Sequence, residues 1–382
     1  MADSGLERLY VLGAWHSAGE SGWRWEVRFR SSGRNTGNLL VGHAACRQLR
    51  HAALGAMHTH RPAQVRGNFD RVVVVATNFL SPHFDLSALA DVVETADLPC
   101  LMVGLGAQAA GYRRLAPELQ AGTVRFARAV AERSVVIGVR GEYTASVLRD
   151  LGIHNVEVLG CPSFYTNLSA PLRVERKPFS DVERVAVTGT TDVVGLSFDP
   201  QAKAEVERTL FRLADASGYP YVFQSELPEI LYLERPDPER AQALERSAGR
   251  MGYDRVEEYA AAVRRIGRVF FDVDAWFDFV RGQDLVVGTR LHGAVAALLQ
   301  GVPAIVVYHD SRTREICELL GLPRISVTEA SGLSLEAIYA RVRFDELTPR
   351  HAALIPRYVD LLERNGVAHC FGAAPATARA AG

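Results

Sequence analysis

Short apolar runs rich in β-branched residues alternate with longer segments of helical periodicity, and this alternation constrains the fold more than any other feature of the chain. These runs lie at 8–13, 71–76, 99–104, 135–139 and 156–160, and at 184–189, 220–224, 268–272, 284–288 and 304–308. Helical segments lie at 38–51, 85–96, 116–133 and 141–151, and at 200–217, 237–250, 254–266, 273–281, 292–300 and 311–320. Strands that alternate with helices build parallel sheets with helices on both faces, so we expect an α/β fold.

The length of 382 residues favours two domains. We expect a Rossmann-like domain at 1–168 and a second one at 184–347, because 169–183 has two prolines, mixed charge and no periodicity. The C-terminal segment 348–371 contains an amphipathic helix at 348–365, and we expect the Ala/Pro-rich tail 372–382 to be disordered. Two such domains facing each other place a ligand cleft at the carboxyl ends of their strands.

Composition and charge argue against several classes of protein. The net charge is −1 with both signs mixed, which is atypical of a nucleic-acid binder. We find no apolar stretch long enough to span a membrane and no signal peptide, and five scattered cysteines without CxxC spacing are typical of the cytoplasm. His51, His58 and His60 have no carboxylate or cysteine at ligand spacing, so we expect no metal. The near-fingerprint Gly104-x-Gly106-x-x-Ala109 is not followed directly by a helix, so we expect no cofactor.

The turn Gly288-Thr289-Arg290-Leu291-His292-Gly293 joins a buried strand to a small-residue helix. The start of a helix presents unpaired N–H groups and a partial positive charge, which favour a bound phosphate or carboxylate. Arg290 adds a guanidinium group suited to bidentate anion binding, and His292 adds a group that titrates near neutral pH. The alternative is a purely structural turn, in which Arg290 forms a salt bridge and His292 caps the helix.

The segment VVGTRLHGAVAALLQGVPAIVVYHDSRTREICELLGLP, at 286–323, resembles the C-terminal signature of the polysaccharide pyruvyl transferase family. Arg312 stands where that family usually has a lysine. Asn35-Thr-Gly-Asn38 and Gly104-Leu-Gly-Ala-Gln108 are similar to two further family elements, as are Val139-Arg-Gly-Glu-Tyr-Thr144 and Gly160-Cys-Pro-Ser163. Gly141 departs from the aspartate expected there.

The resemblance implies a two-domain, GT-B-like fold and the transfer of a pyruvyl group from phosphoenolpyruvate to a sugar diol. The product is a cyclic pyruvate ketal, and phosphate is released. Ketal formation needs a proton on the methylene carbon of the donor, and our candidate acid is His292. The N-terminal domain is assigned to the acceptor and the C-terminal domain to phosphoenolpyruvate.

The remaining candidate residues follow strand ends or match family elements. Glu226 and Asp272, beside Asp274, are candidate general bases, with helix capping or solvation as the alternative. For anion or sugar binding we add Arg140, Asn38, Gln108 and Arg312 to Thr289, Arg290, Leu291 and Gly293. Arg140 has the alternative of a salt bridge with Glu142 or Asp150, and Asn38 that of a helix cap.

Two rival functions remain open at the level of sequence. A GT-B glycosyltransferase would use a nucleotide sugar and shares the fold; Glu315 is the nearby candidate to hold its ribose. A non-catalytic sugar- or phosphate-binding protein would keep the site without the chemistry. The acceptor is a sugar, an oligosaccharide or a lipid-linked glycan, and the last would bring the enzyme to a membrane surface. The sequence leaves the oligomeric state open.

Overall fold

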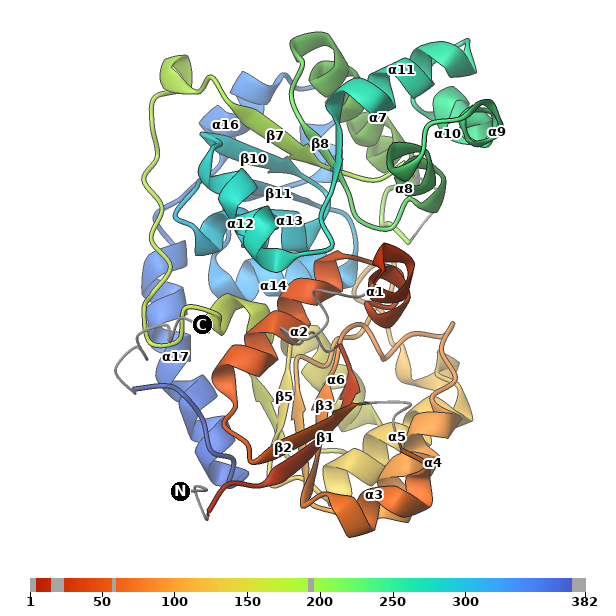
Figure 1. Cartoon of the computed structure of the whole chain (residues 1–382). Helices are drawn as coiled ribbons and strands as arrows, with labels where there is room; N and C mark the ends of the chain where they lie inside the picture. The colour runs from red at the N-terminus through yellow and green to blue at the C-terminus, as the bar shows by residue number, and fades with distance from the viewer. Residues whose placement is uncertain (1–4, 15–23, 57–59, 192–195, 373–382) are drawn as a thin grey trace, which may run out of the picture.

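A computed structural model describes residues 5–14, 24–56, 60–191 and 196–372 (Figure 1). It contains two α/β lobes, each built on a parallel sheet, as the alternation of strands and helices predicted. The N-terminal lobe contains strands β1 to β6, and the C-terminal lobe contains β7 to β12. The sequence allows Trp15, Trp23 and Trp25 either to stack on a sugar or to form a small hairpin core. Trp15 and Trp23 lie outside the described residues, as do His58 and most of the predicted tail.

The N-terminal lobe has a sheet in the order β2-β1-β3-β4, followed by the parallel pair β5-β6. An isolated parallel bridge from Leu105 to Val139 connects β5 to the segment after β4. The strands are β1 (Arg8–Gly13), β2 (Ala53–Ala56), β3 (Arg71–Val75), β4 (Cys100–Val103), β5 (Ile137–Val139) and β6 (Val156–Val158). All five residues of β3 are buried, as expected for a central strand covered on both faces.

The C-terminal lobe has the strand order β12-β11-β10-β7-β8-β9, which is the order of a Rossmann fold. The strands are β7 (Val185–Thr188), β8 (Tyr221–Phe223), β9 (Gly267–Val269), β10 (Leu285–Gly288), β11 (Ala304–Tyr308) and β12 (Arg324–Ser326). The direction of winding reverses between β7 and β10, and ligands of such sheets bind at the carboxyl ends of those two strands. The turn at 288–293 follows β10 directly, so it lies at this switch point.

Helices cover the faces of both sheets. The N-terminal lobe has α1 (Trp25–Ser31), α2 (Gly37–Gln48), α3 (Pro62–Asn68), α4 (Ser87–Ala96), α5 (Ala121–Glu132) and α6 (Glu142–Asp150), with 3-10 turns η2 (Ala116–Glu118) and η3 (Pro162–Tyr165). After η4 (Phe179–Asp181) come α7 (Pro200–Ser217), α8 (Leu227–Glu234), α9 (Pro238–Gln242), α10 (Glu245–Arg250), α11 (Val256–Ile266), α12 (Val273–Arg281), α13 (Leu291–Leu299), α14 (Ser311–Leu320), α15 (Val327–Ala330), α16 (Leu335–Arg341) and α17 (Leu347–Arg364).

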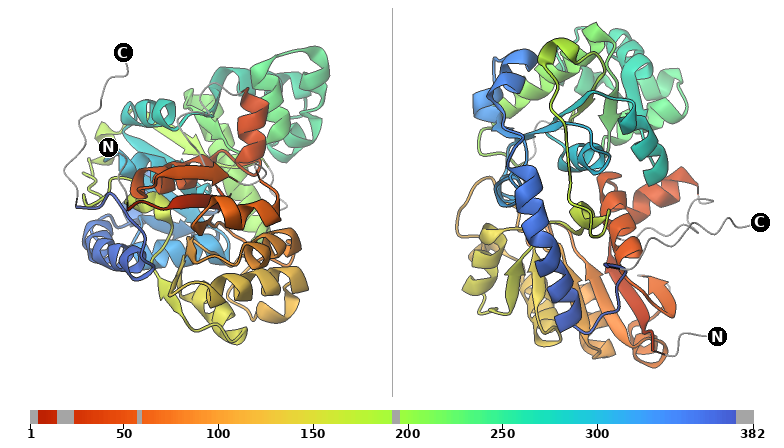
Figure 2. Two further views of the ribbon diagram at one scale, coloured as in Figure 1. Left: turned by 60° about the horizontal axis from the view of Figure 1, so that its bottom comes forward. Right: turned by 90° about the vertical axis from the view of Figure 1, so that its left-hand side faces the viewer.

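Helix α7 shows how the sequence sets these boundaries. The Asp199 side chain accepts the N–H of Ala202, Pro200 occupies the first turn, and Gly218 ends the helix in the left-handed conformation. The last helix, α17, starts beside the C-terminal lobe and runs along the N-terminal lobe (Figure 2). There the Tyr358 hydroxyl donates to Gln48. No helix in the described part of the chain is long and apolar enough to cross a membrane.

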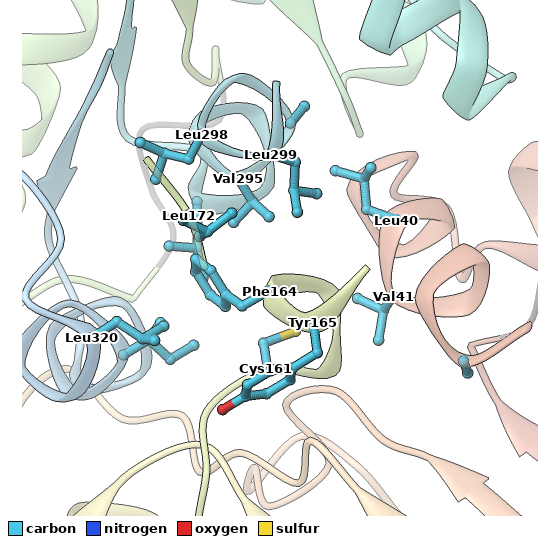
Figure 3. Close-up of a cluster of buried hydrophobic side chains, with 14 of the residues drawn as sticks. Leu40, Val41, Cys161, Phe164, Tyr165, Leu172, Val295, Leu298, Leu299 and Leu320 are labelled. Atoms are coloured by element: carbon cyan, nitrogen blue, oxygen red, sulfur yellow. The ribbon is translucent and has the colours of Figure 1, made fainter. Parts of the chain in front are cut away.

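The two lobes meet along an apolar seam on one side. Side chains of α2, η3 and α13 pack together there, among them Val41, Phe164 and Val295 (Figure 3). One continuous hydrophobic cluster thereby includes strands of both sheets. The other side of the junction is polar. There the start of α14 forms hydrogen bonds with the segments after β4 and β5. The candidate site lies between these two seams.

Candidate functional site

Two glycines in the turn between β10 and α13 allow it to lie against β7. A Cβ atom on Gly288 would lie 1.8 Å from the carbonyl oxygen of Thr188, and one on Gly293 would lie 2.5 Å from the Thr188 methyl carbon. Neither position therefore accepts a side chain. We predicted that Gly293 allows a ligand to approach the backbone, but the close approach at Gly293 is to β7.

Thr289 and Leu291 direct their side chains into the protein. The Thr289 hydroxyl donates to the carboxylate of Glu207, which also accepts the N–H of Thr190 at 2.9 Å. Burial raises the pKa of Glu207 to about 7, although these hydrogen bonds oppose the shift. Leu291 packs in the core of the lobe junction. Both side chains thus support the turn, and we assign them no side-chain contact with substrate.

Arg290 and Glu226 form a buried ion pair at the switch point. The guanidinium group of Arg290 donates to the Glu226 carboxylate and to the hydroxyls of Thr190 and Ser225. Burial alone would raise the pKa of Glu226, but the positive charge of Arg290 and hydrogen bonds from Ser225 and Thr190 hold it below its usual value. Such a carboxylate is a weak base. The geometry therefore favours Glu226 as the residue that orients Arg290.

His292 faces the other lobe. Its Nε2 atom lies 3.7 Å from the sulfur of Cys161, at the start of η3, and the Ser163 hydroxyl donates to the same sulfur at 3.1 Å. Gly37, at the start of α2, has no side chain, and a Cβ there would lie 3.0 Å from the His292 Cβ. His292 is 5% exposed and lies at the lobe junction.

Arg140 enters the junction from the N-terminal lobe. It directly follows β5 and is fully buried. Its Nε donates to the Gly104 carbonyl at 2.7 Å and one Nη donates to the Ala76 carbonyl at 3.4 Å, while Nη1 has no hydrogen-bond partner among the described atoms. Gly106 gives it room, since a Cβ there would lie 2.9 Å from the Arg140 Cδ. A buried guanidinium N–H of this kind can donate to an anion.

The salt-bridge alternative for Arg140 is wrong. Glu142 is near Arg149 instead, with 3.9 Å between the charged atoms, and Asp150 pairs with Arg114 at 3.1 Å. Both of these pairs lie on the exposed side of α6. Arg140 therefore has no carboxylate within salt-bridge distance in the described part of the chain.

Arg312 enters the junction from the C-terminal lobe, in the first turn of α14. Its Nε lies 3.7 Å from the carboxylate of Asp310 but makes no hydrogen bond with any described atom. The same carboxylate accepts the amide of Gln108 at 3.0 Å, and the Gln108 oxygen accepts the amide of Asn78. Gln108 thus joins the two lobes next to Arg312, and its amide group is already hydrogen-bonded on both sides.

Arg140, Arg312 and His292 form one electrostatic unit. Burial, followed by the positive charges of Arg140 and Arg312, lowers the pKa of His292 well below its usual value. The imidazole is therefore neutral before an anion binds. An anion between the two guanidinium groups would cancel this repulsion and raise the pKa of His292. Anion binding and protonation of His292 are coupled by this arrangement.

Asp272 and Asn38 have local structural partners. The Asp272 carboxylate caps α12 by accepting the N–H of Ala275 at 2.9 Å, and it lies 3.5 Å from Arg28. Asp272 therefore caps a helix, which was the alternative to its role as a general base. The Asn38 amide donates to the carbonyl of Ser32 at 2.9 Å, so it closes the loop before α2 rather than capping the helix.

His309 and Cys161 were given no role near the site by the sequence-based reasoning, and Glu315 was considered only for a nucleotide ribose. His309, at the end of β11, is buried, its Nδ1 has no partner among the described atoms, and burial lowers its pKa to about 4. Cys161 contacts His292, and Glu315 reaches the other lobe through Thr144. His309 stands one residue before Asp310 in the motif already singled out, so its position after a strand was a usable signal. The other two depend on how the lobes meet.

Comparisons with known proteins give several solved structures of low similarity and one family. No curated protein matches the sequence. Among solved structures, Anabaena Alr3699/HepE in complex with UDP and glucose has 11% identity and a TM-score of 0.45, over 94% of this chain and 97% of that one. S. aureus MnaA with UDP has 13% identity and a TM-score of 0.43, over 93% and 95%. UDP-N-acetylglucosamine 2-epimerase from Rickettsia bellii has 10% identity and a TM-score of 0.45, over 94% and 96%. The polysaccharide pyruvyl transferase family model matches residues 35–311, and the chain belongs to this family of transferases.

Proposed function

We propose that this protein transfers the pyruvyl group of phosphoenolpyruvate to two hydroxyls of a sugar, forming a cyclic ketal and releasing phosphate. The observation that carries the proposal is a pair of guanidinium N–H groups beside His292, Nη1 of Arg140 and Nε of Arg312, that make no hydrogen bond within the described part of the chain. Phosphoenolpyruvate carries a phosphate ester and a carboxylate on the same carbon, and two guanidinium groups from opposite lobes suit such a donor.

Arg290 completes the positive side of the site. Its Nε has no partner among the described atoms, and the pairing of its Nη with Glu226 fixes the orientation of the planar group. We assign Arg290 to the donor as well, with Glu226 as the residue that positions it. The start of α13 adds the partial positive charge of a helix N-terminus.

Protonated His292 delivers its proton to the methylene carbon, and the adjacent carbon becomes electrophilic. One sugar hydroxyl attacks this carbon, the phosphate leaves, and the second hydroxyl closes the ring. Two hydroxyl protons are released in total. One replaces the proton that His292 gave to the new methyl group, and the other leaves with the phosphate. The reaction therefore balances without an outside acid or base, and general acid catalysis of this kind contributes about 10²–10⁴ in rate.

The nucleotide-sugar alternative loses its ribose-binding candidate. Glu315 is 3% exposed, and both of its carboxylate oxygens accept hydrogen bonds from Thr144. It is therefore not available to a ribose in this structure. We place the reaction in the cytoplasm, with a sugar, oligosaccharide or lipid-linked glycan as acceptor.

Thermal stability with each donor tests the proposal. A ligand at 100 times its dissociation constant adds about 2.7 kcal/mol to the stability of the folded protein. We expect phosphoenolpyruvate to raise the melting temperature and UDP- and GDP-sugars to leave it unchanged. Phosphate release in the presence of a panel of glycans then separates an enzyme from a binding protein. Stabilisation by the nucleotide sugars alone would contradict the proposal.

A further inference from the structure

Helix α6 begins without a capping side chain of its own. Its N-cap residue is Gly141, and the N-cap side chain normally accepts the backbone N–H of the third helical residue, which here is Thr144. In this protein the acceptor is Glu315 of α14, in the other lobe. Its Oε2 accepts the Thr144 N–H at 2.9 Å, and its Oε1 accepts the Thr144 hydroxyl at 2.6 Å. Glu315 therefore caps α6 across the lobe junction.

The absence of a side chain at position 141 is what makes this contact fit. A Cβ atom on Gly141 would lie 2.5 Å from Oε2 of Glu315, 2.6 Å from its Cβ and 2.7 Å from its Cδ. The Glu315 side chain thus occupies the space in which a residue at 141 would carry its own capping group. A side chain at 141 and Glu315 exclude each other in the closed arrangement.

The capped helix starts directly after Arg140. The Arg140 N–H donates to the Leu105 carbonyl at 2.9 Å, and the Thr144 hydroxyl accepts the N–H of Ala107 at 2.9 Å. The cap therefore fixes the segment that carries Arg140 and the segment after β4 that its guanidinium group contacts. The Glu315 carboxylate also supports the positive charge of Arg140, since it acts against the effect of burial on the Arg140 pKa.

Other hydrogen bonds lie along the same seam as the cap. Ser311 exchanges hydrogen bonds with Ala109 at 2.9 and 3.1 Å, and Tyr112 donates to Glu318 at 2.9 Å. Each of these contacts joins α14 to the N-terminal lobe. Separation of the lobes along this seam would leave the first turn of α6 without an acceptor for the Thr144 N–H.

We propose that Glu315 is a positioning residue for Arg140 that acts from the opposite lobe, so that the anion site is completed only when the lobes are closed. The proposal rests on the assignment of Arg140 to phosphoenolpyruvate. It assigns Glu315 no contact with the substrate. Because Gly141 has no side chain to cap α6, the first turn of this helix is ordered only when the lobes are closed.

Three variants test the cap and its coupling to binding. Glu315→Ala removes the cap, and Gly141→Asp/Glu315→Ala restores a cap within α6 itself, in the space that Glu315 vacates. Glu318→Ala is the control, because Glu318 lies one turn further along α14 and contacts the other lobe without reaching α6. Hydrogen–deuterium exchange of 141–148 without ligand reports the cap, and calorimetric titration with phosphoenolpyruvate reports the anion site.

We expect Glu315→Ala to speed exchange in the first turn of α6 and to weaken phosphoenolpyruvate binding, each by about tenfold. The double variant should return exchange to the wild-type range and recover most of the lost affinity, because its new cap again fixes the segment that carries Arg140. Glu318→Ala should match wild type in both measurements. Wild-type affinity in Glu315→Ala, or restored exchange without any recovery of affinity in the double variant, would overturn the proposal. A wild-type protein that binds no phosphoenolpyruvate would contradict the proposed function, while the exchange data would still test the cap.

Discussion

Replacement of Arg140 by methionine tests the anion site most simply. Methionine keeps an unbranched side chain in the buried position but removes the unpaired Nη1 donor. A hydrogen bond to a charged group contributes about 1.5–3 kcal/mol, and each 1.4 kcal/mol is a factor of about ten in affinity. We therefore expect Arg140→Met to weaken phosphoenolpyruvate binding by about 10- to 100-fold.

The assay is isothermal titration with phosphoenolpyruvate, with the melting temperature of each variant measured alongside it. Arg140→Met also leaves the carbonyl groups of Gly104 and Ala76 without their donor, so some loss of stability is expected. The control is Arg114→Met, which removes an exposed arginine of the same lobe that pairs with Asp150. Folded Arg140→Met protein with an affinity within about twofold of wild type would refute the assignment, because that difference is well below the expected loss.

Three further predictions follow from other contacts. Gly293→Ala should lower the free energy of unfolding by about 1–3 kcal/mol, because its methyl group would meet the Thr188 side chain. The second change Thr188→Gly should restore part of this loss. Urea unfolding that shows no change in Gly293→Ala would contradict this packing. Burial lowers the pKa of His351 from 6.5 to about 4. The free energy of unfolding should therefore fall by about 3 kcal/mol as the pH drops from 6.5 to 4. Unfolding measured at several pH values should show that His351→Gln removes this dependence. Equal acid sensitivity in His351→Gln would exclude it as the source. His292 should take up a proton when phosphoenolpyruvate binds. Calorimetry in buffers of different ionisation heat detects this uptake, and the same uptake in His292→Gln would locate the proton elsewhere.

Much of the fold followed from local sequence patterns. Helix α7 has the predicted bounds, because Asp199, Pro200 and Gly218 mark its ends. Strand β2 was missed, since its sequence Ala-Leu-Gly-Ala has no β-branched residue and it is held by pairing with β1. The helix predicted at 237–250 is two helices, α9 and α10. Trp25 lies in helix α1 and packs on Phe271 of the other lobe, so the hairpin considered for the tryptophans is wrong at this residue.

The site was predictable only as far as its residues follow strand ends. Arg290 and His292 share a turn, so their proximity followed from the sequence. Their environments did not. Cys161 meets His292 over a separation of 131 residues, and Glu315 meets Thr144 over a separation of 171. Both contacts depend on how the two sheets face each other. Local patterns contain no information on that arrangement.

The central claim is that His292 donates a proton to the methylene carbon of the donor while guanidinium groups from both lobes hold its anionic groups. His292→Gln tests it most directly, with phosphoenolpyruvate affinity and phosphate release measured on the same sample. At a pH high enough to keep His292 neutral in both the free and the bound state, the account predicts affinity close to that of wild type. At the lower pH where wild type is active, it predicts no phosphate release with an acceptor that wild type uses. Phosphate release at the wild-type rate in His292→Gln would contradict it.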